Sequence, residues 1–166
     1  MKFYIYAFFA MLIFCNISCK EGGSGGSEYE IKSNEITWLN LEQAEDLENG
    51  VKKMYFLDLY TSWCGWCKVM DRETFTNAEI IKYMNEHFHN VKFDAEQKEQ
   101  ATFDGKKYDW VAGGRNGVNQ LAVELLQGDL SYPSYVVLDE NKKLVKTFKG
   151  FMEAESFLQV IKSVVP

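Results

Sequence analysis

Two cysteines separated by two residues are the chemically reactive pair of this sequence. They lie in the stretch Trp63-Cys64-Gly65-Trp66-Cys67. A disulfide between them closes so short a loop that it gives almost no entropic stabilisation. The pair is therefore predicted to be redox-active rather than structural.

The position of the pair at a predicted helix start indicates how it would react. A helix is expected to open at Gly65 and to run to Glu73. Unpaired N–H groups and the helix dipole favour a thiolate at that end, so Cys64 is the expected nucleophile. Cys67, one turn further on and expected to be more buried, would resolve the mixed disulfide by attacking Cys64.

A carboxylate six residues before Cys64 is the candidate proton acceptor. Residues 54–60 form a nearly continuous apolar run, typical of a central strand covered on both faces, and Asp58 interrupts it. A carboxyl group in an apolar site has a raised pKa and can accept the proton of a resolving thiol. The alternative, a strand-end Asp58 that faces solvent, is disfavoured by its apolar neighbours.

The order of the surrounding elements predicts an α/β fold with a central mixed sheet flanked by helices. Expected strands are 36–39, 54–60, 91–94, 135–138 and 144–148. Expected helices follow Asn40 and Thr76, open at Gly65, and cover 118–126 and 151–164. Helices between strands imply parallel pairs, and the final strand hairpin adds an antiparallel one. Capping patterns begin two helices, Asn40 with Gln43 and Thr76 with Glu79.

Residues 95–117 are the least regular part of the predicted domain, which spans 36–165. Asp104-Gly105 indicates a small hairpin, and residues 113–117 are typical of a loop. Gly128 is the expected stop of the helix that follows. The segment is either a substrate-selecting flap beside the cysteines or a distal decoration, and the sequence leaves both open.

Residues 56–68, from the central strand through the second cysteine, resemble the central strand and active-site turn of the thioredoxin family. Pro133 in Ser-Tyr-Pro-Ser corresponds to the family's cis-proline, and Gly150 to its late glycine. Extended through Thr74 and Phe75, the stretch resembles exported thioredoxin-like proteins that accompany bacterial disulfide-reducing systems. The resemblance implies the thioredoxin fold, with 95–117 inserted before the proline, and thiol–disulfide oxidoreductase activity, as reductase or isomerase rather than oxidant. No cofactor beyond the Cys64–Cys67 disulfide is expected.

The resemblance also assigns the surface on which a substrate would dock. Trp63 would shape that surface beside Gly65 and Trp66, with a core position as the alternative for Trp63. Trp66 replaces the proline common in thioredoxin, and this position tunes the redox potential, so the direction of electron flow stays open. The backbone of Tyr132, before a cis Pro133, would pair with an extended substrate strand.

A lysine on the neighbouring strand often accompanies the buried acid in that family. The expected register places Asn90 opposite Asp58, with Lys92 two residues further on. The electrostatic balance of Asp58 is therefore left open by the sequence.

The first 18 residues are expected to be a signal peptide, with Lys2 ahead of an apolar run. Ile17-Ser18-Cys19 resembles the lipobox of bacterial lipoproteins, which implies cleavage before Cys19 and lipid attachment to it. Asn16 stands where that family usually has Leu, so an ordinary cleaved signal or a retained anchor helix are the alternatives. Residues 19–35, rich in Gly and Ser, would then form a flexible tether.

Export and anchoring together predict location and partners. The protein is expected at the bacterial cell envelope, facing the periplasm. The outer membrane is favoured because Lys20 follows Cys19, where lipoproteins retained in the inner membrane have an aspartate. Expected partners are exported proteins with disulfides or thiols and an upstream redox partner such as a membrane electron transporter. The net charge of −6 argues against nucleic acid. A monomer is expected.

Zinc binding, haem attachment and a non-catalytic class of protein are the alternatives to this prediction. A zinc site would need two further ligands, and His87 and His89 are expected away from the cysteines, so no metal is expected. A c-type haem motif fails because Lys68, not histidine, follows Cys67. A non-catalytic thioredoxin-fold binding module is the remaining alternative, disfavoured because both cysteines and Asp58 are present.

Overall fold

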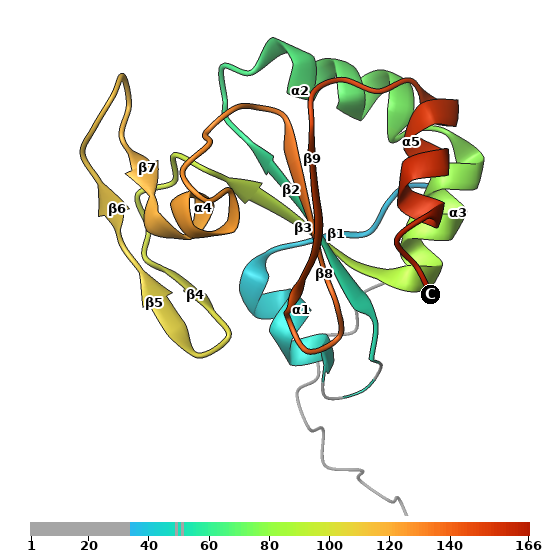
Figure 1. Ribbon diagram of the computed structural model, residues 1–166, viewed down its shortest axis with the longest axis horizontal. Helices are drawn as coiled ribbons and strands as arrows, with labels where there is room; N and C mark the ends of the chain where they lie inside the picture. Colours follow the sequence, from blue (N-terminus) through green and yellow to red (C-terminus); the bar gives the residue numbers. More distant parts are fainter. Residues whose placement is uncertain (1–33, 49, 51) are drawn as a thin grey trace, which may run out of the picture. The chain divides into compact units, whose positions relative to one another are not determined.

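The computed structural model describes residues 34–166 except 49 and 51 (Figure 1). The predicted signal peptide, the lipid site at Cys19 and the tether up to residue 33 lie outside the described residues. Within the described part, no helix is both long and apolar enough to cross a membrane.

The main sheet of the described residues has five strands in the order β1-β3-β2-β8-β9. Their bounds are β1 Trp38–Leu39, β2 Met54–Tyr60, β3 Phe88–Asp94, β8 Ser134–Leu138 and β9 Leu144–Lys149. The central β2 is parallel to β3 and antiparallel to β8. This sheet confirms the mixed α/β architecture predicted from the order of elements.

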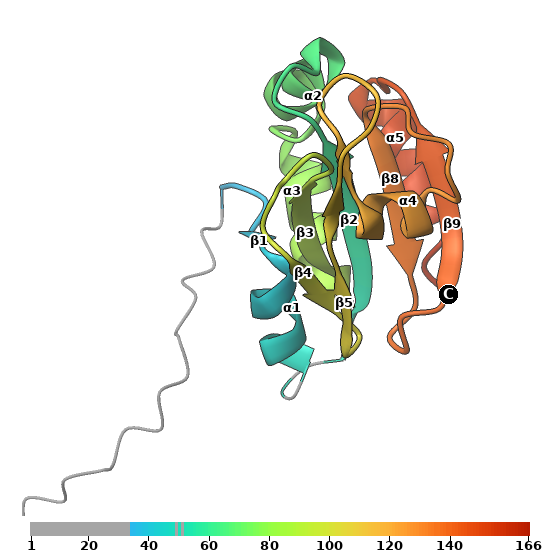
Figure 2. The same ribbon diagram turned by 90° about the vertical axis from the view of Figure 1, so that its left-hand side faces the viewer.

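Helices cover both faces of the sheet because β2 sends alternate apolar side chains to each (Figures 1 and 2). Tyr55 and Leu57 face the core beneath α1 (Leu41–Glu48) and α4 (Gln120–Leu125). Phe56 faces the opposite core, which α3 (Ala78–His87) and α5 (Ala154–Lys162) cover. Asp58 follows Phe56 by two residues, so it enters the second of these cores.

One of the two predicted caps is confirmed and the other is wrong. The Asn40 side chain accepts from the Gln43 backbone N–H at 2.8 Å, and the Gln43 side chain accepts from that of Asn40 at 2.9 Å. At α3 the cap is Asn77, not Thr76, and its Oδ1 accepts from the backbone N–H groups of Glu79 and Ile80. Asparagine is a better cap than threonine, and this shifts the helix start by one residue.

Several predicted boundaries also shift. The differences are a β1 that is shorter than 36–39, a β3 that begins at Phe88, an α5 that is shorter than 151–164, and Val118 in a strand rather than in α4. The helix from Gly65 continues beyond α2 (Gly65–Val69) as the π-helical turn η1 (Met70–Thr74). β3 was underestimated because it holds buried polar residues, His89 and Asn90, at positions where apolar ones were expected.

The insertion is more regular than its sequence predicts. β4 (Ala101–Phe103) and β5 (Lys106–Tyr108) form the predicted hairpin, whose turn residues Asp104 and Gly105 have φ of 51° and 69°. Positive φ at both positions is typical of a two-residue hairpin turn. β6 (Trp110–Val111) then pairs with β7 (Val118–Asn119) around the loop 112–117. Figure 1 shows both hairpins to the left of the sheet.

Candidate active site

The cysteine pair lies at the start of α2, as predicted. Cys64 is the N-cap residue, with an extended backbone, and it forms a disulfide with Cys67 in this structure. The Cys67 backbone N–H donates to the Cys64 Sγ, with an N···S distance of 3.1 Å. A donor in this place at a helix start stabilises a thiolate on the same sulfur.

Burial does not distinguish the two cysteines in this oxidised form. Cys64 is 3% exposed and Cys67 is 4% exposed. The prediction that Cys67 is the more buried of the two is therefore wrong here. Cys64, the N-cap residue of α2, is itself packed into the protein, so both cysteines are covered to the same extent.

Asp58 is buried on β2 and has Lys92 as its partner on β3. The two residues face each other in the register, and Lys92 Nζ lies 3.5 Å from Asp58 Oδ2. Asn90, which was expected opposite Asp58, pairs with Phe56 instead. That expectation is wrong because β3 begins at Phe88, which pairs with Met54, the first residue of β2. Every β3 residue therefore pairs with a β2 residue two positions earlier than expected.

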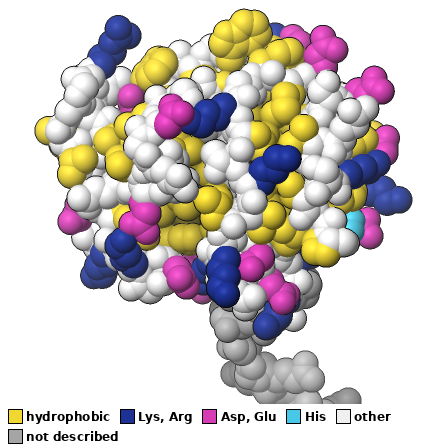
Figure 3. Space-filling view, viewed as in Figure 1, with side chains coloured by type: hydrophobic (Ala, Val, Ile, Leu, Met, Phe, Trp, Pro, Cys, Tyr) yellow, Lys and Arg dark blue, Asp and Glu magenta, His cyan; other side chains and the backbone are white. Residues whose placement is uncertain are grey.

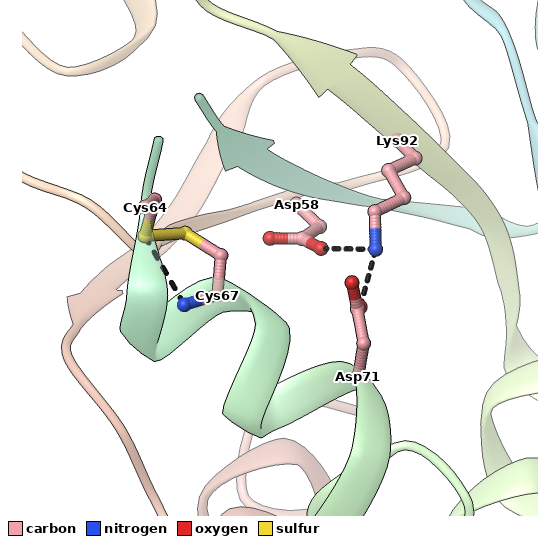
Figure 4. A network of polar contacts seen from close by, with 5 residues as sticks. All are labelled: Asp58, Cys64, Cys67, Asp71 and Lys92. Atoms are coloured by element: carbon pink, nitrogen blue, oxygen red, sulfur yellow. Dashed lines mark hydrogen bonds and ion pairs between the residues drawn. A yellow bond between two sulfur atoms is a disulfide. The ribbon is translucent and has the colours of Figure 1, made fainter. Parts of the chain in front are cut away.

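A second carboxylate, Asp71 on η1, completes the charge cluster (Figure 4). The Lys92 ammonium donates to Asp71, which is partly exposed, and it also lies over the rings of Trp38 and Tyr60 at 5.1 and 5.4 Å. The sequence analysis missed Asp71. The signal was its place four residues after Cys67, because residues at this spacing share a helix face.

The carboxyl group of Asp58 lies between the lysine and the disulfide. In Figure 4 one oxygen faces Lys92 and the other faces toward the disulfide. This second oxygen, Oδ1, is buried and has no hydrogen-bond partner among the described residues. Burial raises the pKa of Asp58 to about 7, Lys92 opposes the shift, and the charge of Asp71 adds to it. The group can therefore take up and release a proton near neutral pH.

A tyrosine that the sequence analysis also missed lies across the strand pair from Asp58. Tyr135 on β8 faces Asp58 in the register and is fully buried among aromatic rings. Its hydroxyl has no partner among the described residues. Burial, together with the nearby charge of Asp58, raises the pKa of Tyr135. Tyr135 lies in an apolar stretch of the sequence, which gave no indication that its hydroxyl is buried near Asp58.

Aromatic side chains surround the disulfide at the surface. Trp63 is 54% exposed and Trp66 is 60% exposed, which rules out the core alternative for Trp63. The Trp63 ring meets Tyr132 edge-on at 6.2 Å, and Trp66 lies 5.5 Å from Phe151. Figure 3 shows exposed hydrophobic side chains at the end of the domain where α2 lies.

The turn between α4 and β8 reaches the same aromatic surface. The Tyr132–Pro133 peptide bond is cis, which is the isomer that the resemblance implied for Pro133. Burial and the nearby charges of Glu96 and Asp94 raise the pKa of Tyr132 to about 12. Gly65, the first residue of α2, has open space where a side chain would begin.

The histidines lie elsewhere in the fold. His87 packs on Tyr83 within α3, with 4.3 Å between the ring centroids, and His89 faces Tyr55 in the sheet. Over residues 34–166, leaving aside 49 and 51, no group of three or more His, Cys, Asp or Glu side chains is arranged to hold a metal ion.

Parts of the sequence match a family model and known proteins. The family model Thioredox_DsbH, described as a protein of unknown function, DUF255, matches residues 27–108. Human spermatogenesis-associated protein 20 is 35% identical over 66 residues, which are 39% of this chain. The chain spans only 8% of the length of that relative.

Solved structures show the same fold. The DsbH oxidoreductase matches with a TM-score of 0.55 and 19% identity, over 86% of this chain and 93% of that one. A thioredoxin from Thermus thermophilus matches with a TM-score of 0.57 and 14% identity, over 78% and 87% of the two chains. At such low identity the likeness establishes the thioredoxin fold, which confirms the predicted fold class.

Proposed function

We propose that this chain, which has the thioredoxin fold, acts as a thiol–disulfide oxidoreductase through Cys64 and Cys67. The observation that carries the proposal is the placement of the disulfide at a helix start directly beside a buried carboxyl group. A binding module needs neither a reactive sulfur at a helix N-terminus nor a proton acceptor behind it. The geometry therefore favours the enzyme over the docking scaffold.

The first step in the reducing direction uses Cys64. The Cys64 thiolate attacks one sulfur of a substrate disulfide, so that a Cys64–substrate S–S bond forms and the substrate S–S bond breaks. The departing substrate sulfur leaves as a thiolate and takes a proton from water. The N–H of Cys67 and the start of α2 stabilise the attacking thiolate before this step.

The second step uses Cys67 and Asp58. Asp58 accepts the thiol proton of Cys67, and the resulting thiolate attacks the Cys64 sulfur. The mixed disulfide breaks, the substrate leaves as its second thiolate, and the Cys64–Cys67 disulfide forms. The substrate gains two electrons and the cysteine pair loses two. An upstream dithiol returns these electrons, and Lys92 with the more exposed Asp71 connects Asp58 to solvent for release of the proton.

The finer assignment is a reductase or isomerase of exported proteins. It is supported by the resemblance of residues 56–75 and by the predicted signal peptide. The reduction potential of the cysteine pair tests the direction of electron flow. A value of about −270 mV favours reduction, whereas a value of about −120 mV would make the protein an oxidant and overturn this assignment.

Anchoring at the envelope through a lipid on Cys19 belongs to the same proposal. It is supported by the sequence Ile17-Ser18-Cys19. We expect Cys19→Ala to abolish lipid labelling and to release the protein from membranes. Retention of the unlabelled variant in the membrane would instead indicate an uncleaved signal helix.

Insulin reduction is the direct test of activity. The intact chain should reduce insulin in the presence of a dithiol, and Cys64→Ser should abolish the reaction. Activity that survives this substitution, or an intact chain without activity, would overturn the proposed function. Cys19→Ala is the matched control, because it changes a cysteine outside the predicted domain of residues 36–165 and leaves Cys64 and Cys67 in place.

A further inference from the structure

The carboxylate of Glu96 joins the insertion to the active-site surface. Both oxygens of Glu96 accept from the indole N–H of Trp63, with N···O distances of 3.0 Å. Asn116, in the loop between β6 and β7, donates to Glu96 Oε2 at 2.9 Å. Asn116, Glu96 and Trp63 therefore form a continuous chain of hydrogen bonds from the insertion to the residue beside Cys64.

The loop 112–117 is shaped so that Asn116 can reach this position. The Gly117 backbone N–H donates to the carbonyl of Gly113 at 2.7 Å, which closes the loop on itself. Gly117 has φ of +76°, and a side chain there would begin 2.2 Å from the Trp110 ring. The base of the loop is held by Asn119, whose backbone N–H donates to the carbonyl of Ala95 at 2.8 Å.

Three segments meet at Trp63 as a result. Trp63 precedes α2, Glu96 is the second residue of the insertion, and Tyr132 precedes the cis proline. The Trp63 ring packs against Tyr132, and the Glu96 charge acts on the Tyr132 hydroxyl. A polypeptide that brings its disulfide to Cys64 offers this group a larger surface to contact than a small disulfide does.

We propose that Glu96 and Asn116 are positioning residues that make the insertion part of the specificity surface for polypeptide disulfides. They hold the indole of Trp63 in one orientation beside Cys64, and the loop 112–117 continues the surface that the indole forms. The inference rests on the proposed function and deepens it, because it names disulfides within polypeptide chains, rather than small disulfides, as the selected substrates. It also decides between the flap and the distal decoration in favour of the first.

Steady-state kinetics with two substrates tests this inference. Insulin serves as the polypeptide disulfide and bis(2-hydroxyethyl) disulfide as the small one. Loss of the Asn116 hydrogen bond should raise the KM for insulin about fivefold in Asn116→Ala, with kcat and the rate on the small disulfide unchanged. Asn141→Ala, an asparagine change in the β8–β9 turn, is the matched control and should leave both substrates unaffected.

Glu96 gives a second variant and a spectroscopic readout. Glu96→Gln retains one acceptor for the indole, so its insulin KM should lie between those of the intact chain and Glu96→Ala. The indole N–H resonance of Trp63 should shift in Asn116→Ala and in Glu96→Ala, and a merely structural role in a distant insertion would not move it.

The outcomes separate the two levels of the proposal. Equal losses on both disulfides, or an unchanged insulin KM in both the Asn116 and the Glu96 variants, would overturn the inference and leave the proposed function standing. An intact chain inactive towards both substrates would instead overturn the proposed function.

Discussion

At the scale of single residues, the carboxyl group of Asp58 is the proposed proton acceptor of the site. Its pKa of about 7 lies close to the pH at which a thiol proton must be accepted. In the intact chain the rate of mixed-disulfide resolution should therefore rise as the pH increases through about 7. In Asp58→Asn this rise should disappear, with a rate at pH 8 lower by about 100-fold. Stopped-flow measurement of resolution between pH 5 and 9 checks this, and an unchanged profile would remove Asp58 from the mechanism.

The same group destabilises the folded protein at high pH. Its pKa is raised in the folded state from 3.8 to about 7, so the folded state binds the proton more tightly than the unfolded chain does. Stability is therefore lost as the pH rises from about 4 to 7, and the full penalty applies above 7. Asp58→Asn should raise the free energy of unfolding at pH 8 by about 2–4 kcal/mol and change it little at pH 4. Urea unfolding at the two pH values checks this, and a variant less stable at pH 8 would contradict it.

Tyr135 offers a test of the unpartnered hydroxyl. The hydroxyl is buried without a hydrogen-bond partner among the described residues, and such a group destabilises a core. Tyr135→Phe keeps the ring packing on Phe56 and should raise the free energy of unfolding by about 1 kcal/mol. Tyr108→Phe is the matched control, because its hydroxyl donates to Glu124 at 2.9 Å and its loss should not stabilise the protein. A destabilised Tyr135→Phe would show that the hydroxyl is satisfied in solution.

At the scale of elements, the glycines of the loop 112–117 allow a paired test. Gly117→Ala would place a methyl group 2.2 Å from the Trp110 ring and at a positive φ, so it should destabilise the insertion by about 1–3 kcal/mol. Gly113→Ala meets nothing within 4 Å and should have little effect. Hydrogen exchange of β6 and β7 measures the difference. Equal protection in the two variants would mean that the loop adapts to the added side chain.

The sequence predicted the elements wherever pattern and local chemistry agreed. The apolar run of β2, the helix start at Gly65 and the Asp104-Gly105 hairpin are all present. Each of these depends on neighbouring residues alone, and residue types specify such features directly.

What the sequence did not predict depends on contacts between distant elements. The partner of Asp58 follows from the register of β2 and β3, and one shift in the start of β3 exchanged Asn90 for Lys92. Asp71 and Asn116 act through Lys92 and Glu96, which lie 21 and 20 residues away along the chain. No local pattern records such pairings, so the acid pair and the hydrogen bonds that link Asn116 to Trp63 through Glu96 are visible only in the three-dimensional arrangement.

At the scale of the whole molecule, the arrangement of cysteines predicts how its substrates can be captured. Cys64 would form the mixed disulfide and Cys67 would release it, so Cys67→Ser in the full chain should leave substrates covalently bound to Cys64. Diagonal gels under non-reducing and reducing conditions then separate the captured proteins, and Cys64→Ser is the control that should capture none. If polypeptides are selected by the surface around Trp63, combining Cys67→Ser with Asn116→Ala should reduce the amount captured, since fewer encounters lead to attack. Equal capture by the Cys64→Ser and Cys67→Ser variants would mean that proteins adhere without disulfide exchange, as expected of a binding module.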